Sequence, residues 1–385
     1  MTFASSTDGT RFVRIDAWVS GSGFNFSNLL ITGFETIQYD PGSAGTRENI
    51  AWTDCTFTNV GDDPVVDSYI YFGPYFNNVS YTRCVFDFND TAKLTAAPDI
   101  KIESAYNVSF VDCEFYTNPN ANRVMHIRGD DTKGAVADAP SSTITLTGNT
   151  IHELPAGATK GIFFGGIAID SSVDSVIVKF NTIVGNPSPS GAQYLIEIEN
   201  TYDATEVFSE HFDISYNHLT GGTVGIVIAE GGLRGSVIGN RIIGPSAQGI
   251  LVQDSRWVTF ANNWVSDSAI GFETDSGGAR GENSYGVKVT GNVFENCAIG
   301  LNKDVATTVQ DSAFVYSGNL FANCTTPVQI NGVDKTLAEW KTYQPVGAPL
   351  APPAGIGAVE YPGGENDAAV KRNGAIPHGF IRYLG

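Results

Sequence analysis

The sequence lacks the features that identify most nucleic-acid-binding and membrane proteins. It contains no run of basic residues, and 22 basic against 41 acidic residues give a net charge of −19. This charge disfavours binding to nucleic acid and to anionic membrane surfaces. No stretch approaches the roughly 18 to 20 apolar residues of a membrane span, and the first 30 residues lack the apolar core of a signal peptide. We therefore expect neither a nucleic-acid partner nor a membrane partner.

Cysteine and methionine are also scarce. Five cysteines are an odd number and none lies in a C-x-x-C pair, so neither a zinc site nor a complete disulfide framework is indicated. Only 16% of the residues are charged, whereas 42% are apolar, which is enough for a substantial core. The 43 glycines, 23 phenylalanines and 15 tyrosines favour a chain with many turns and much β-strand.

A phrase of four residues, centred on asparagine or cysteine and ending in an apolar residue, recurs along the chain. It reads "DCTF", "RCVF" and "DCEF" early in the sequence and "GNTI", "GNRI" or "GNVF" later, and we assign "ITGF" at residue 31 as its first copy. The central position is then occupied by Thr32, Cys55, Cys84, Cys113, Asn149, Asn181, Asn217, Asn240, Asn263, Asn292 and Asn319. Successive copies are 23 to 36 residues apart, which indicates a fixed unit carrying loops of different length.

Each unit also holds a second apolar run with a period of two, such as "IKIE", "IAID" and "IEIE", which predicts a β-strand. A unit this short cannot bury its apolar face alone, but stacked copies can, with neighbouring strands about 4.8 Å apart. We predict an all-β right-handed parallel β-helix of about eleven coils in residues 1–344. Thr336 and Glu339 form a capping-box pattern that predicts a short helix. The Pro/Gly-rich residues 345–385 predict an irregular tail that packs on the β-helix or caps it.

The "G-N-x-φ" turns followed by "G-I-x-φ" strands resemble the pectin-lyase-like superfamily of single-stranded β-helices, from about residue 12 to residue 335. The resemblance implies this fold and a function among its polysaccharide lyases, glycoside hydrolases, epimerases, tailspikes and adhesins. It also implies an extracellular protein, secreted or surface-associated, although no signal peptide is visible in this chain. The protein would be a monomer or a homotrimer, since tailspike relatives are trimers. The Tyr-Gly-Phe-Asp-Pro-His run of mannuronan epimerases is absent, so no family residue is carried over.

The recurring asparagines and cysteines are expected to be structural. An amide can bond to the backbone of its own coil and to the next amide in a stack, which satisfies buried donors. Cys55, Cys84 and Cys113 would form a column of stacked thiols. Cys297 and Cys324 would form a second stacked pair, whose parallel Cβ directions disfavour a disulfide.

The outward positions of the second strand differ in kind, because ionisable residues of both signs follow one another on consecutive coils. Residues of mixed charge can shift one another's pKa, as in many functional sites. The three longest coils lie at the same level, and their loops would wall a groove of roughly 15 Å, the length of about three sugars. The residues that we expect to act in this groove are Lys101, His126, Arg128, Asp170, Glu197 and Glu199.

Such a groove suits a linear acidic polysaccharide and β-elimination at a uronate sugar. This reaction needs a cation on the sugar carboxylate, a base for the adjacent C–H and an acid for the leaving oxygen. Arg128 or Lys101 would neutralise, His126, Lys101 or Arg128 would act as the base, and Tyr71 or His126 as the acid. Asp170, Glu197 and Glu199 are expected to hold Ca²⁺, and no organic cofactor is expected. The further substrate contacts that we predict are Tyr71, Glu103, Tyr202, Glu273 and Asp275.

Two alternatives remain open. A glycoside hydrolase or transglycosylase would use two carboxyl groups about 5 to 5.5 Å apart for retention or about 6.5 to 9.5 Å apart for inversion. Asp170 and Glu199 on adjacent coils fit the shorter separation, and Glu197 and Glu199 on one strand fit the longer. The other alternative is a non-catalytic tailspike or adhesin that binds glycan.

Overall fold

The described part of the chain consists almost entirely of short parallel strands. All described residues fall within a compact unit of residues 1–347, and the predicted tail, residues 345–385, lies outside them. The computed structural model describes residues 2–4, 23–32, 37–39, 47–58, 70–72, 76–89, 98–103, 105–119, 121–129, 141–155, 164–170, 173–199, 209–229, 232–253, 255–275, 284, 286–303 and 314–342.

The strands form three sheets. Sheet A follows the recurring turn and contains β1 (Thr2–Ala4), β3 (Leu30–Thr32), β6 (Thr56–Thr58), β9 (Val85–Asp87), β12 (Glu114–Tyr116), β15 (Thr150–Ile151), β18 (Thr182–Val184), β21 (His218–Thr220), β25 (Arg241–Ile243), β28 (Trp264–Ser266), β31 (Val293–Glu295) and β34 (Leu320–Ala322). Sheet B contains β4 (Ile37–Tyr39), β7 (Ile70–Phe72), β10 (Ile100–Glu103), β13 (Arg123–Arg128), β16 (Phe164–Asp170), β19 (Gln193–Glu199), β22 (Val224–Ile228), β26 (Gln248–Val252), β29 (Ile270–Thr274), β32 (Ile299–Lys303), β35 (Thr326–Ile330) and β36 (Val333–Lys335). Sheet C contains β2 (Phe24–Ser27), β5 (Arg47–Thr53), β8 (Phe76–Thr82), β11 (Tyr106–Val111), β14 (Ser141–Thr147), β17 (Val173–Lys179), β20 (Ser209–Ser215), β24 (Ser236–Ile238), β27 (Thr259–Ala261), β30 (Val287–Thr290) and β33 (Phe314–Ser317), with β23 (Gly232–Leu233) paired to β20.

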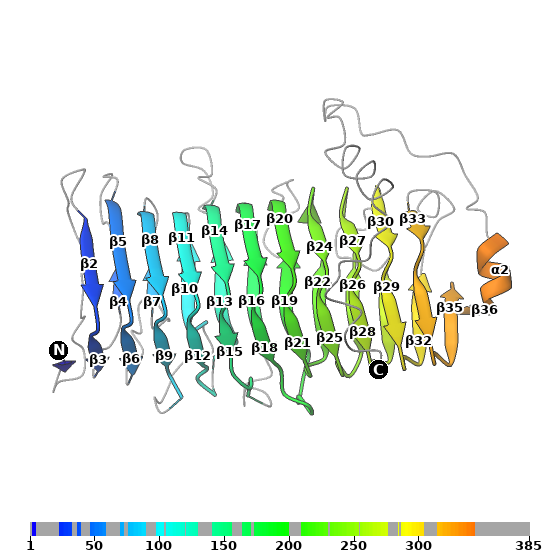
Figure 1. The fold of residues 1–385 in the computed structure, drawn as a ribbon, viewed down its shortest axis with the longest axis horizontal. Helices are drawn as coiled ribbons and strands as arrows, with labels where there is room; N and C mark the ends of the chain where they lie inside the picture. Colours follow the sequence, from blue (N-terminus) through cyan, green and yellow to red (C-terminus); the bar gives the residue numbers. More distant parts are fainter. Residues whose placement is uncertain are drawn as a thin grey trace, which may run out of the picture. The chain divides into compact units, whose positions relative to one another are not determined.

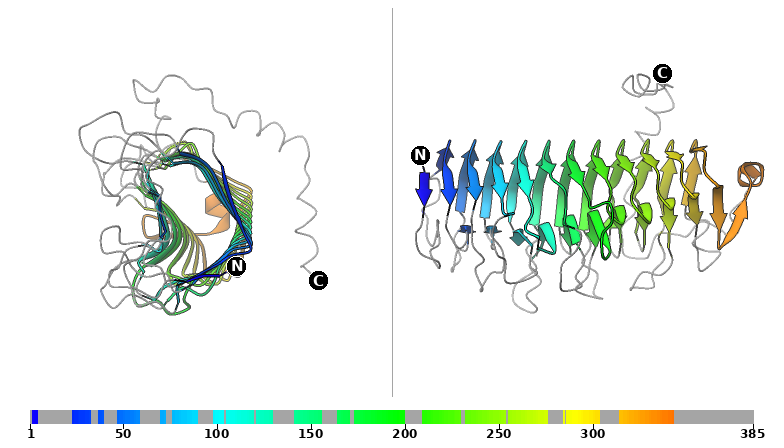
Figure 2. Two further views of the ribbon diagram at one scale, coloured as in Figure 1. Left: turned by 90° about the vertical axis from the view of Figure 1, so that its left-hand side faces the viewer. Right: turned by 90° about the horizontal axis from the view of Figure 1, so that it is seen from below.

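The chain visits the sheets in the repeating order C, A, B, and each strand up to β35 pairs in parallel with its counterpart one coil away. Figure 1 shows the coils side by side, and the end-on view in Figure 2 shows the three sheets as sides around a common interior. The described strands of sheet C run from β2 to β33, one for each coil. The prediction of a right-handed parallel β-helix of about eleven coils is confirmed.

The interior is filled by columns of like side chains, because stacked coils place equivalent positions above one another. Trp52, Tyr81 and Phe110 form one such column, with ring centroids 6.2 and 4.8 Å apart. Phe57 and Phe86 stack in a second column at 5.0 Å. Offset stacking of this kind adds about 0.5–1.5 kcal/mol per pair to the gain from burial.

The recurring asparagines form a continuous hydrogen-bonded ladder from Asn149 to Asn319. At Asn181 the side-chain Nδ2 donates to the Leu146 carbonyl at 2.9 Å and to Asn217 Oδ1 at 3.0 Å, while the backbone N–H donates to the same Oδ1 at 2.9 Å. Asn217 repeats this pattern with Asn240. These side chains are therefore structural, as predicted.

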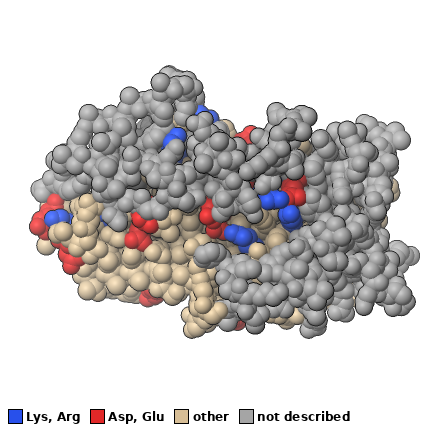
Figure 3. All heavy atoms as spheres, turned by 180° about the vertical axis from the view of Figure 1, so that it is seen from behind, with Lys and Arg blue, Asp and Glu red and all other residues tan. Residues whose placement is uncertain are grey.

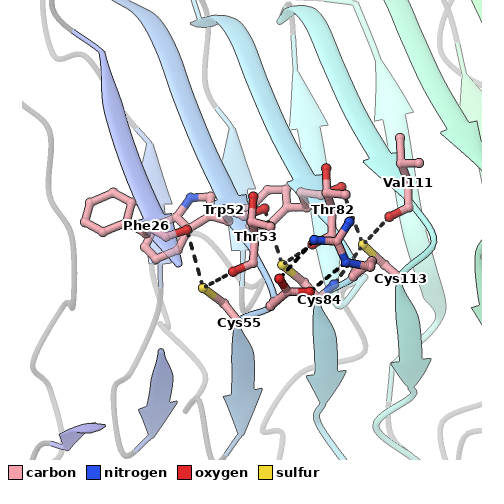
Figure 4. A network of polar contacts seen from close by, with 11 residues as sticks. Phe26, Trp52, Thr53, Cys55, Thr82, Cys84, Val111 and Cys113 are labelled. Carbon is pink, nitrogen blue, oxygen red and sulfur yellow. Dashed lines mark hydrogen bonds and ion pairs between the residues drawn. The ribbon is translucent and has the colours of Figure 1, made fainter. Parts of the chain in front are cut away.

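A column of thiols continues the ladder toward the N-terminus (Figure 4). Cys55 Sγ donates to the Phe26 carbonyl at 3.7 Å, Cys84 Sγ to Trp52 at 3.6 Å and Cys113 Sγ to Tyr81 at 3.5 Å. The Cys113 N–H donates to Asn149 Oδ1 at 2.9 Å, which joins the two columns. All five cysteines are free, including Cys297 and Cys324.

The first copy of the recurring phrase is not where the sequence placed it. β3 pairs with β6 so that Leu30 lies opposite Thr56, which makes Leu29, not Thr32, the counterpart of Cys55. The Thr56 N–H donates to the Leu29 carbonyl at 2.8 Å, as Thr150 does to Cys113. A leucine fills the inward site in this coil by packing against the core, so no polar residue marks the turn.

The stack ends in a hairpin and a helix. β36 runs antiparallel to β35, and the predicted helix is α2 (Leu337–Thr342). Its capping box is present: the Thr336 N–H donates to Glu339 Oε2 at 2.7 Å, and the Glu339 N–H donates to Thr336 Oγ1 at 3.2 Å.

Asn217→Ala is expected to lower the free energy of unfolding by about 2–4 kcal/mol. The change leaves the Val178 carbonyl and the Asn181 N–H buried without partners, each at a cost of about 1–3 kcal/mol. Cys113→Asn is the matched exchange and should cost less than about 1 kcal/mol, because the new amide can reach the Tyr81 carbonyl as the thiol does. Urea unfolding measures both values. Equal losses for the two variants would show that the ladder does not contribute as a hydrogen-bonded unit.

Candidate functional site

The predicted ionisable residues form two rows on the outer face of sheet B. Strand pairing places Lys101, His126, Ala168 and Glu197 opposite one another on β10, β13, β16 and β19. The second row, two residues further along each strand, contains Glu103, Arg128, Asp170 and Glu199. The register thus agrees with the sequence prediction, whereas the catalytic roles of these residues stay predictions.

A third row was missed from the sequence. Arg123, Gly165 and Tyr194 lie opposite one another at positions three residues before His126, Ala168 and Glu197. Val124 and Met125 are both buried between the two rows, so the strict alternation that served for the other positions fails here. The same offset of three recurs at Val224 and Gln248 on the next strands, and this repetition was the available signal.

Three ion pairs and one contact between a histidine and a carboxylate organise the cluster. Arg123 Nη2 lies 3.2 Å from Glu197 Oε2, and His126 Nε2 lies 3.4 Å from Asp170 Oδ2. Lys101 Nζ lies 2.9 Å from Glu103 Oε1, and Arg128 contacts the same oxygen. Both cations predicted to neutralise a substrate carboxylate are therefore held by one glutamate.

These outward-facing groups are nevertheless buried. The exposed fractions of His126, Asp170 and Glu197 are 9%, 5% and 3%. An ionised group is costly to bury unless it is paired or hydrogen-bonded. Glu197 is paired with Arg123, and Asp170 is hydrogen-bonded to His126. Clusters of this kind are typical of sites where protons are transferred.

The environment of His126 favours its neutral form. Burial lowers the pKa of His126 most, the hydrogen bond with Asp170 opposes this, and the nearby charges of Arg123 and Arg128 lower it further. Burial also raises the pKa of Tyr194, and the carboxylates of Glu197 and Glu199 add to this shift. A neutral imidazole and a protonated phenol thus lie on opposite sides of β16.

Two of the other predicted substrate contacts, Glu273 and Asp275, do not join this cluster. Glu273 accepts hydrogen bonds of 2.6 Å from Gln248 and from Asn302, and Asp275 accepts one of 2.7 Å from Gln253. Glu273 lies on β29, three strands beyond β19. The intervening strands carry an apolar cluster of Val224, Val227 and Ala229, with Tyr194 and Leu251 packed against it. Tyr202 and the side chain of Tyr71 lie outside the described residues, although the backbone of Tyr71 pairs with Lys101.

The predicted calcium ligands are placed as follows. Asp170 and Glu199 lie opposite each other on adjacent strands, while Glu197 contacts Arg123 and Asp170 contacts His126. Within the described ranges, no group of three or more His, Cys, Asp or Glu side chains is arranged to hold a metal ion. Calcium binding by Asp170, Glu197 and Glu199 stays a prediction.

Charges of both signs are interspersed on the face seen from behind in Figure 3, and neither sign dominates among the side chains described there. In the described part of the chain, no helix has the length and apolar character needed to cross a membrane.

Opposite shifts of the His126 titration are expected from two single substitutions. Asp170→Asn removes the hydrogen bond that raises the pKa of His126 and should lower it, whereas Arg123→Gln removes a repelling charge and should raise it. Arg241→Gln, an equal change of charge on sheet A, should leave it unchanged. In the unfolded chain His126 takes up its proton near pH 6.5, whereas in the folded protein it does so only at a lower pH. His126 should therefore lower the free energy of unfolding as the pH falls from about 6.5 through the lowered pKa of the folded state. NMR titration of the ring measures the shifts, and shifts of the same sign in both variants would contradict this description.

Comparisons with known proteins give one family and several similar folds. The model of a family described as periplasmic copper-binding protein (NosD) matches residues 113–349, and no curated protein matches the sequence. The chain is similar to the A-module of the mannuronan C-5 epimerase AlgE6 of Azotobacter vinelandii, at a TM-score of 0.53 and 14% identity over 80% of this chain and 82% of that one. It is also similar to PfbA, a surface adhesin of Streptococcus pneumoniae, at 0.48 and 14% over 80% of each chain. A tailspike protein of bacteriophage CBA120 matches at 0.42 and 12% over 83% of this chain and 53% of that one.

At these identities the solved structures show the fold alone. The family model, in contrast, covers more than half of the 385 residues. The chain therefore belongs to the family described as periplasmic copper-binding protein (NosD).

Proposed function

We propose that this protein binds a linear acidic polysaccharide on the outer face of sheet B and removes the proton next to a uronate carboxylate. The reaction would be β-elimination, or epimerisation, which begins with the same proton removal. The observation that carries the proposal is the burial of His126, Asp170 and Glu197 on the outward face of the sheet. Structural charges on an outward strand face would ordinarily be solvated, whereas burial beside charged neighbours is one way in which enzymes tune the pKa of a general base.

His126 is the proposed base. With its Nε2–H donating to Asp170 Oδ2, the neutral ring keeps a lone pair on Nδ1, which can accept the proton of the sugar C–H. Asp170 then stabilises the imidazolium that forms. The electron pair of the broken C–H bond becomes the new carbon–carbon double bond, and the bond to the leaving oxygen breaks. His126 is a more suitable base than Lys101 or Arg128, because both of these cations are held by Glu103.

Tyr194 is the proposed acid for the leaving oxygen. Its phenol stays protonated because burial and two carboxylates raise its pKa. It lies on β19, and His126 lies on β13, so a sugar seated over β16 would have one on each side. In elimination Tyr194 donates its proton to the departing oxygen, whereas in epimerisation it would return a proton to the sugar carbon from the opposite side.

Metal ions are not required by these steps. The family description names copper, which prefers thiolate, thioether and imidazole ligands. In this chain the buried thiols of Cys55, Cys84 and Cys113 point to backbone carbonyls, and the described residues contain no group of three potential ligands. The donor set of the described residues therefore does not fit copper. The predicted Ca²⁺ site has the same weakness, since Arg123 and His126 already contact two of its three carboxylates.

Hydrolysis is the second candidate, because Asp170 and Glu199 lie opposite each other on adjacent strands, as two catalytic carboxyl groups would. A glycan-binding protein without catalysis is the third. We place the protein outside the cytoplasm, in the periplasm or at the cell surface, since the family description is periplasmic.

Incubation with alginate, pectate, dermatan and neutral glycans, with and without chelator, separates these candidates. We expect an unsaturated product that absorbs in the ultraviolet, formed from an acidic glycan and unaffected by chelator. His126→Gln should reduce kcat at least about 100-fold, the usual contribution of a general base, with the fold intact by circular dichroism. His152→Gln, at a half-buried position directly after β15 of sheet A, is the matched control and should keep full activity. Reducing ends without unsaturation would indicate hydrolysis, and binding without any product would indicate an adhesin. Loss of activity with chelator would indicate that the reaction needs a metal ion.

A further inference from the structure

Strand β16 leaves a gap in the side chains of the candidate site. It presents Gly165 and Ala168 to the outer face, opposite Arg123 and His126 on β13 and opposite Tyr194 and Glu197 on β19. With about 4.8 Å between strands, the larger side chains of β13 and β19 start about 10 Å apart. The small residues of β16 are therefore flanked on both sides by ionisable and aromatic side chains, and Ala168 itself is buried.

Arg123 crosses this gap. A Cβ atom placed on Gly165 would lie 3.4 Å from Arg123 Cγ and 3.9 Å from its Nε, so the side chain lies directly over the glycine. From there Nη2 reaches Glu197 Oε2 on β19 at 3.2 Å. A side chain at position 165 would occupy the path of the arginine.

The hydrogen-bonding capacity of this guanidinium is only partly used. Nε is buried and has no hydrogen-bond partner, although a buried unsatisfied donor costs about 1–3 kcal/mol. Such a donor in a folded protein needs an explanation, and a bound group that it serves is one. Nε and Nη2 together form the edge of the guanidinium that a carboxylate contacts with both of its oxygens.

We propose that Arg123, held over Gly165, binds the carboxylate of an acidic sugar seated over β16. The identity of the ligand as a sugar rests on the proposed function. The carboxylate supplies the acceptor that Nε lacks. Nη2 can keep its contact with Glu197, because it carries two N–H groups and only one of them points to the ligand. Arg123 thereby takes the neutralising role that the sequence assigned to Arg128 or Lys101. Gly165 is a positioning residue, since it keeps the path of Arg123 open.

Binding measured by calorimetry tests the carboxylate site. The probes are tetrasaccharides from alginate, pectate and dermatan, each paired with its carboxyl-reduced counterpart. We expect at least one acidic probe to bind the unmodified protein at least tenfold more tightly than its reduced form. Arg123→Gln should abolish this preference and leave the reduced probe unchanged. Arg123→Lys should restore only part of it, because lysine lacks the planar edge.

Glycine variants test the positioning independently. Gly165→Ala adds a methyl group 3.3 Å from the Tyr194 carbonyl and 3.4 Å from Arg123 Cγ, so a partial loss of the preference is expected. Gly165→Val should lose it as fully as Arg123→Gln does. Gly191→Val is the matched control, since a Cβ at this exposed position meets no atom within 4 Å. Thermal unfolding of each variant confirms that the loss is not a loss of fold.

Three outcomes would overturn the inference. In the first, the unmodified protein binds none of the acidic probes. In the second, it binds each acidic probe no more tightly than the carboxyl-reduced counterpart. In the third, Arg123→Gln weakens the binding of both forms equally. In these cases Nε is satisfied by water and Arg123 is structural. The result is separable from the proposed reaction. Turnover of an acidic glycan with an unchanged KM in Arg123→Gln would refute only the inference, whereas a charge preference without any product would refute only the reaction.

Discussion

The constraint on which the rest of this structure depends is the vertical repeat of parallel strands, about 4.8 Å from coil to coil. Every side chain must lie beside its counterparts from the coils before and after it. A position is therefore tolerable only if its residue packs or bonds well with residues like itself. Amides satisfy this condition because each is both donor and acceptor, and aromatic rings satisfy it by offset stacking. Charges satisfy it best beside a neighbour of opposite sign, as Glu103 does beside Arg128, although the same row also places Asp170 beside Glu199.

The same repeat explains why so much of the fold was predictable from one sequence. The asparagine phrase marks the same point of each coil, so it determines the phase of every following strand and hence the register of sheet B. The predicted register is wrong where the marker is absent. At Leu29 an apolar residue replaces the amide, and the nearby "ITGF" resembles the phrase closely enough to displace the assignment by three residues.

The candidate site was predictable in position and less so in its contacts. Strand alternation identified two rows, but it could not anticipate that Val124 and Met125 both turn inward and bring Arg123 to the outer face. Nor does spacing tell which of several cations a carboxylate will hold. Lys101 and Arg128 share Glu103 because their flexible side chains reach the same oxygen, whereas Arg123 spans two strands through the gap at Gly165. Which cation contacts which carboxylate depends on the length of each side chain and on neighbouring positions without a side chain, such as Gly165. The order of residues along the strands does not show these contacts.

The hairpin at the end of sheet B has a consequence for how the molecule behaves in concentrated solution. A stack of parallel strands ends in unpaired backbone groups, onto which another chain can add and so begin a fibre. β36 turns back and occupies the edge of β35 in the antiparallel direction, and α2 follows directly. A second molecule winding in the same sense would meet a reversed strand and could not continue the coil. The last described turn of the chain thus covers this edge of sheet B against the addition of a further parallel strand.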